Sequence, residues 1–171
     1  MQLHGYRRRQ RYIPVMTEAR SPAAHAELIA AARDRLLTFA ATCTDETWHS
    51  RPLAAHGDHR TVGVIVDHVA HAYEYMGGWV REILAGTDPQ VDVALVDRLN
   101  AAHTARAEHL TQAGAMEHLT RSGDDFVALI AGLRAADLAA DGGRVRRFAE
   151  IAARHPDTHR TDIQEALGDS A

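Results

Sequence analysis

Residues 61–85 have the sequence TVGVIVDHVAHAYEYMGGWVREILA, in which apolar side chains recur at alternating steps of three and four residues. That spacing places them on one face of an α-helix. Thr61 is a suitable N-cap, and the run Gly86-Thr87-Asp88-Pro89 is a strong stop signal. The stretch therefore predicts a long helix that buries one face against other helices, along Val62, Ile65, Val69, Ala72, Met76, Trp79 and Ile83.

Three other segments have helical periodicity. They predict helices over residues 22–42, 112–135 and 144–167. Ser21-Pro22 would open the first of these helices, and a break at Asp141-Gly142-Gly143 precedes the last. Residues 91–109 have helical propensity but a weaker pattern, and they form one long connection. No stretch alternates at period two for long enough to predict a strand. The chain is thus predicted to be all-α, a four-helix bundle with one long connection.

Composition narrows the class of protein. The 171 residues suit one domain, expected at 21–168, with residues 1–20 as a disordered N-terminal extension. The single cysteine, Cys43, excludes a disulfide within the chain and a cysteine-based zinc site, and it favours a cytoplasmic location. The net charge of -4 argues against a nucleic-acid partner, and no apolar run is long enough to predict a membrane span.

Twelve histidines are present, and one pair of them, His155 and His159, is spaced i, i+4. The pair falls on the apolar stripe of the last predicted helix, which runs Phe148, Ala152, His155, His159, Ile163 and Leu167. Burying two imidazoles is costly unless their nitrogens are bonded. Because residues at i and i+4 project from adjacent turns, one shared metal ion would satisfy both.

The helix at 61–85 offers a third ligand, either His68 or His71. Three imidazoles suit Zn²⁺, Ni²⁺ or Fe²⁺ and leave a coordination position open, as in catalytic sites. The alternative is a set of core histidines that bond to Tyr75, Asp67 or the backbone. Asp67, Glu74 and Tyr75 are also candidates to orient a ligand histidine. The other histidines are expected at the surface: His4, His25, His49, His56, His59, His103, His109 and His118.

Two motifs resemble a known family. Residues 61–70 resemble the second-helix motif of the DinB-like superfamily, and residues 151–163 resemble its last-helix motif, His-x-x-x-His followed four positions on by an apolar residue. The resemblance covers residues 22–168. It implies an up-down-down-up bundle, a homodimer, and a metal bound by His68, His155 and His159, which favours His68 over His71.

The resemblance also implies a chemistry. Similar proteins include mycothiol-dependent maleylpyruvate isomerase and bacterial S-transferases that use low-molecular-weight thiols. The expected function is therefore that of a metal-dependent enzyme that uses mycothiol or a similar thiol on a small electrophile. Two features depart from the family pattern: the ligands are all histidines, and Pro156 lies between two of them.

Two other functions stay open at this point. One is a non-catalytic bundle, stapled by the metal, with a stress or partner-binding role, in which His71 or a carboxylate would close the fourth position. The other is a metal-free dimerisation module with hydrogen-bonded histidines. No phosphate-binding loop or serine-nucleophile motif is present in the sequence.

Overall fold

The computed structural model describes residues 20–107 and 110–168, and these ranges contain helices and no strand. The all-α prediction is confirmed, but the described ranges hold seven α-helices where the sequence analysis expected four. The elements, with one 3-10 helix, are α1 Pro22–Thr42, α2 Asp45–His49, η1 Ala54–His56, α3 Val62–Leu84, α4 Val93–Ala107, α5 Gln112–Ala131, α6 Ala135–Leu138 and α7 Ala140–Gly168. The predicted N-terminal extension lies, apart from Arg20, outside the described residues.

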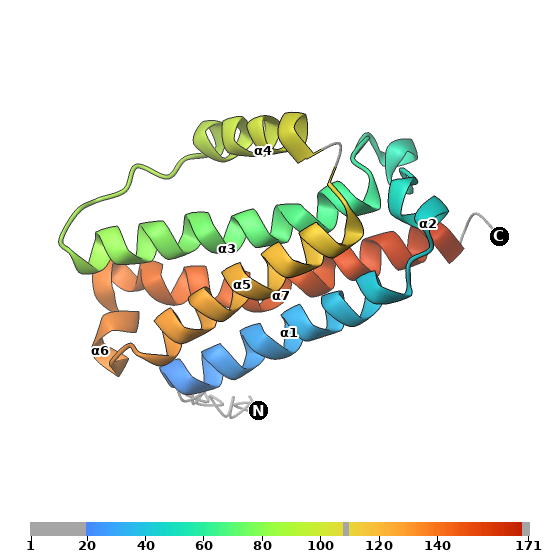
Figure 1. Ribbon diagram of the computed structural model, residues 1–171. Coiled ribbons are helices and arrows are strands. Elements are labelled where there is room, and N and C mark those ends of the chain that lie inside the picture. The colour runs from blue at the N-terminus through green and yellow to red at the C-terminus, as the bar shows by residue number, and fades with distance from the viewer. Residues whose placement is uncertain (1–19, 108–109, 169–171) are drawn as a thin grey trace, which may run out of the picture.

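Four long helices make up the body of the molecule. Helix α1 packs against α5 and α7, and α3 packs against the same two helices. In Figure 1, α1 and α7 run towards one end of the molecule, and α3 and α5 run towards the other. Helix α4 lies outside this group and packs against α3. None of the described helices is both long enough and apolar enough to cross a membrane.

Side-chain caps explain where three of the long helices begin. Ser21, Thr61 and Thr111 each accept a hydrogen bond from the backbone N–H three residues later, at the starts of α1, α3 and α5. A cap of this kind satisfies one of the N–H groups that the first turn of a helix leaves unpaired. The predicted bounds of the first helix are confirmed, and those of the second differ by one residue.

The core joins the apolar faces of the four long helices. Ile29, Leu36, Ile65, Leu119 and Ile163 are all completely buried. Trp48 from α2 covers the start of α3 and is 2% exposed. A Cβ atom on Gly63 would lie 2.6 Å from the Trp48 indole ring, so this close approach requires glycine at position 63. The contact fixes the first turn of α3, directly before Asp67 and His68.

Three segments differ in detail from expectation. The break before the last helix is confirmed, because Asp141, Gly142 and Gly143 have φ values of 50°, 63° and 84°. Helix α5 ends at Ala131, short of the predicted residue 135, and α6 follows it. The predicted connection 91–109 contains α4, whose weak periodicity agrees with its position outside the four-helix body.

Candidate metal centre

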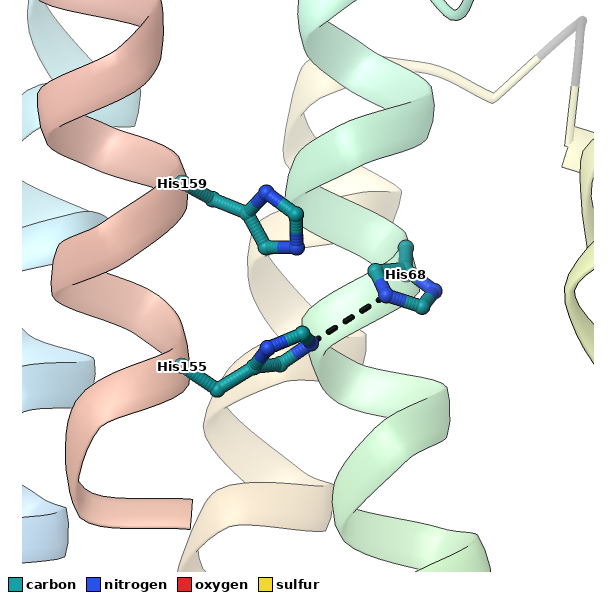
Figure 2. Close-up of side chains that lie close together, drawn as sticks. All are labelled: His68, His155 and His159. Atoms are coloured by element: carbon teal, nitrogen blue, oxygen red, sulfur yellow. Dashed lines mark hydrogen bonds between the residues drawn. The ribbon is translucent and has the colours of Figure 1, made fainter. Parts of the chain in front are cut away.

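The structure brings together the three histidines predicted as ligands. His68 comes from α3, and His155 and His159 come from α7. One ring nitrogen from each can be chosen so that all three lie within 4.8 Å of one another. The Nε2 atoms of His155 and His68 are 3.1 Å apart. Figure 2 shows the rings of His155 and His159 extending from α7 towards His68. We call these three residues the triad.

The local sequence explains the arrangement on α7. His155 and His159 are one turn apart, so their rings meet edge to face with centroids 4.5 Å apart. The helix continues through Pro156, which is buried. His68 lies within the apolar face of α3 and is 8% exposed, while the two α7 rings are half-buried.

Burial sets the charge of the triad. It lowers the pKa of His68 to about 2, of His159 to about 3 and of His155 to about 4, with further lowering from Arg60 and from neighbouring histidines. All three imidazoles are therefore neutral at pH 7, which is the form that binds metal ions. Both nitrogens of His159 are buried without a protein partner. A divalent cation would bind one of these nitrogens, so the donor set of the triad suits a metal ion.

An apolar cavity of about 280 Å³ adjoins the triad. His68 and His155 form part of its wall, and Asn100 from α4 is the uncharged amide in the lining. The rest of the lining is apolar or aromatic: Ala72, Tyr75, Met76, Trp79, Val91, Val96, Leu99, Phe148 and Ile151. The weak pattern of residues 91–109 did not predict a contribution from α4 to this cavity, although Val96 and Leu99 are spaced for one helical face.

A second group of titratable side chains lies beside α3, and we call it the acid–histidine cluster: Asp67, His71, Glu74, His103 and His118. The two carboxylate oxygens of Asp67 lie 2.8 Å from His103 Nε2 and 2.6 Å from His118 Nδ1. Glu74 lies 3.0 Å from a nitrogen of His118 and 3.0 Å from one of His71.

Hydrogen bonding sets the charges in this cluster. Burial by itself would raise the pKa of Asp67, but hydrogen bonds from His103 and His118 outweigh it and hold the pKa well below its usual range. The hydrogen bond to Asp67, aided by Glu74, raises the pKa of His118. Asp67 and Glu74 therefore bond to histidines of the cluster and not to those of the triad. The prediction that one of them orients a triad histidine is wrong for both.

Three of the histidines predicted at the surface are not there. His25 and His103 are 1% exposed, and His118 is half-buried. His25 shares the apolar stripe of Ile29 and Leu36, which is a signal that the sequence contained. His103 on α4 and His118 on α5 bond to Asp67 on α3, and no local sequence pattern indicates contacts between separate helices. The surface prediction is confirmed for His49, His56 and His59, whereas His4 and His109 lie outside the described residues.

The fold and the triad together define an all-helical protein with a histidine site that could hold a metal ion. The family model of the DinB superfamily matches residues 28–163. The chain therefore belongs to the DinB superfamily, as its two motifs predicted. Searches of curated proteins and of solved structures found no match.

Proposed function

We propose that this protein is a metal-dependent enzyme that transfers a low-molecular-weight thiol, of the mycothiol type, to a small apolar electrophile. In this proposal the up-down-down-up bundle holds Zn²⁺, Ni²⁺ or Fe²⁺ through His68, His155 and His159. The observation that carries it is that two triad residues, His68 and His155, lie in the wall of an apolar cavity.

The donor set supports an open metal site. Three neutral imidazoles leave at least one coordination position for an exogenous ligand. In the non-catalytic alternative, His71 or a carboxylate would close that position. His71 instead lies with the acid–histidine cluster, 3.0 Å from a carboxylate oxygen of Glu74. A bound divalent ion at the triad would lower the pKa of a coordinated thiol and so supply a thiolate.

The thiol has to come from a small molecule. Cys43 is the only cysteine, and it lies at the end of α1, outside the lining of the cavity. Its Sγ lies 3.5 Å from the carbonyl oxygen of Phe39, and burial raises its pKa. A thiol of this kind is a weak nucleophile at neutral pH, because the reactive form is the thiolate.

The cavity indicates the class of electrophile. Aromatic rings of Tyr75, Trp79 and Phe148 face a space in whose lining the described residues include no arginine. An apolar or aromatic molecule gains from burial there, whereas a dicarboxylate such as maleylpyruvate would find no cationic side chain in the lining. S-transfer is thus favoured over the isomerase reaction. In the transfer, sulfur bonds to the electrophilic carbon, and the leaving group departs with the electron pair of the broken bond.

The test begins with elemental analysis of the protein purified without a His-tag, beside the His155→Ala/His159→Ala variant. We expect metal at the triad in the wild type and its loss in the variant. A conjugation assay with mycothiol and a chlorinated nitroarene follows, with His49→Ala as the control because His49 is exposed on α2. Turnover that survives metal removal, or that persists in the double variant, would overturn the proposal.

A further inference from the structure

The acid–histidine cluster occupies a different face of α3 from the triad. Asp67, His71 and Glu74 are spaced i, i+4 and i+7, so they form one stripe along the helix. Successive residues on an α-helix are turned by about 100°, which directs Asp67 away from its neighbour His68. The stripe is met by His118 from α5 and His103 from α4. The proposed S-transfer uses none of these residues.

We propose that Asp67, His71 and His118 form a second binding site, for a divalent transition-metal ion, with Glu74 at its edge. One donor atom from each of the first three can be chosen so that all lie within 4.8 Å of one another. Two imidazoles and one carboxylate are a donor set used by Fe²⁺ and also accepted by Zn²⁺ and Co²⁺. The site does not depend on the function of the triad.

The distances in the cluster are close to those that one ion requires. Metal–nitrogen bonds of about 2.0–2.1 Å place two ligands of one ion at most about 4.2 Å apart. The Nδ1 atom of His118 is 2.6 Å from Asp67 Oδ1, and the Nε2 atom of His71 is 3.7 Å from Asp67 Oδ2. Small side-chain rotations would bring these donors around one ion, because α3 and α5 already pack together in the core.

The charges favour a cation. Two carboxylates, from Asp67 and Glu74, flank the same pair of imidazoles, with His118 within 3.0 Å of both and His71 within 3.7 Å of both. Asp67 is 1% exposed, so its negative charge receives little help from water. A divalent ion would neutralise both carboxylates at once.

One further contact and a pocket support a binding site here. The Nε2 atom of His103, itself 1% exposed, lies 2.8 Å from Asp67 Oδ2 and holds the carboxylate in one orientation. Metal ligands commonly have such an outer partner. Asp67, His71 and His118 also line a surface pocket of about 360 Å³, which gives an ion and water access. Arg106 and Arg121 in its wall offer partners to an anion that completes the coordination.

The test is Co²⁺ binding by the His155→Ala/His159→Ala variant, which lacks the triad. We expect the wild type to retain about two equivalents of Co²⁺ after gel filtration and the triad variant to retain about one. The triad variant that also carries His118→Gln should retain no Co²⁺. Glutamine can still donate a hydrogen bond to Asp67, so this change preserves the packing partner while removing the imidazole. His49→Ala, in place of His118→Gln, is the matched control and should retain the ion.

Two outcomes would overturn the second site: no Co²⁺ in the triad variant, or a retained equivalent after His118→Gln. A measurement that needs no change in the cluster is X-ray absorption of Co²⁺ bound to the triad variant. It should report imidazole ligands together with carboxylate oxygen, and a shell of water oxygens alone would contradict the proposal. Melting curves recorded with and without Co²⁺ check that each variant is folded.

Discussion

The triad and the acid–histidine cluster both use histidines and share helix α3, but the electrostatic surroundings of His68 and His118 are opposite. His68 sits among apolar side chains and other histidines, and its pKa is lowered to about 2, chiefly by burial. His118 contacts Asp67 and Glu74, and those hydrogen bonds raise its pKa. Asp67 and His68 are adjacent in sequence, yet Asp67 belongs to the second group.

The comparison teaches that histidine count and spacing do not decide what a histidine does. Burial keeps the triad imidazoles neutral, and the two nitrogens of His159 have no protein partner. In the acid–histidine cluster the carboxylate of Asp67 is already bonded to two imidazoles. The triad therefore contains buried nitrogens that are free to bind an added ion, whereas an ion at the cluster would replace hydrogen bonds that Asp67 already accepts.

The largest expected effect is on metal affinity at the triad. His159→Ala removes one of three ligands and should weaken Zn²⁺ binding there by about 1,000-fold, since loss of an outer partner alone costs about 10–100-fold. His118→Gln should leave triad affinity unchanged. Competition with a chelator at one equivalent of Zn²⁺ measures both. Equal losses in the two variants would mean that the two groups are not separate.

The next effect is on stability. Asp67→Asn removes a buried negative charge that holds His118 and His103, and it should lower the free energy of unfolding of the metal-free protein by about 3 kcal/mol. Urea denaturation gives the value. Asp162→Asn on the exposed side of α7 is the control and should stay within about 0.5 kcal/mol of the wild type. A loss no larger than that of the control would show that the network contributes little.

The pH dependence of stability should separate the groups further. The triad histidines have pKa values below the ordinary 6.5, so the unfolded chain binds more protons between pH 6.5 and about 4. The free energy of unfolding therefore falls with decreasing pH, by about 1 kcal/mol per pH unit for each triad histidine. Urea curves of metal-free protein should show a shallower fall for His155→Leu/His159→Leu.

In the acid–histidine cluster, His118 has the opposite sign to the triad, whereas Asp67 has the same sign as the triad but acts at lower pH. The stabilisation from His118 is fully present below pH 6.5 and is lost as pH rises through its raised pKa. That from Asp67 is present above its ordinary pKa of 3.8 and is lost only as pH falls through its lowered one. His118→Gln should therefore not flatten the acid-side fall that the leucine variant flattens, and a flattened curve would contradict the assignment of charges.

The smallest effect is a gain. His159→Leu removes two buried nitrogens that have no protein partner and should stabilise the metal-free protein by about 1 kcal/mol. Thermal unfolding in the presence of a chelator measures it. The same change at position 118 should destabilise instead, because it leaves the buried Oδ1 atom of Asp67 without the hydrogen bond from His118. A loss of stability at position 159 would mean that its nitrogens are bonded in solution.

Much of the fold could be predicted from short-range signals. The caps Ser21 and Thr61, the break at Asp141 and the apolar stripe of α3 each act within one or two turns of a helix. Helix α4 was missed as an element because it packs mainly on α3 and needs only a narrow apolar face. The predicted end of α5 lies four residues after the observed one, because the apolar pattern continues past Ala131 into the turn before α6.

Helical periodicity relates residues three and four apart, so it was enough to predict the all-helical class, the bounds of most long helices, and the pairing of His155 with His159. The family motifs of the sequence also pointed to His68. Only the tertiary structure decided that Asp67 joins His103 and His118, and that α4 closes an apolar cavity beside the triad. Those contacts join helices distant in the sequence, and they follow from how whole helix faces pack together, which no local pattern encodes.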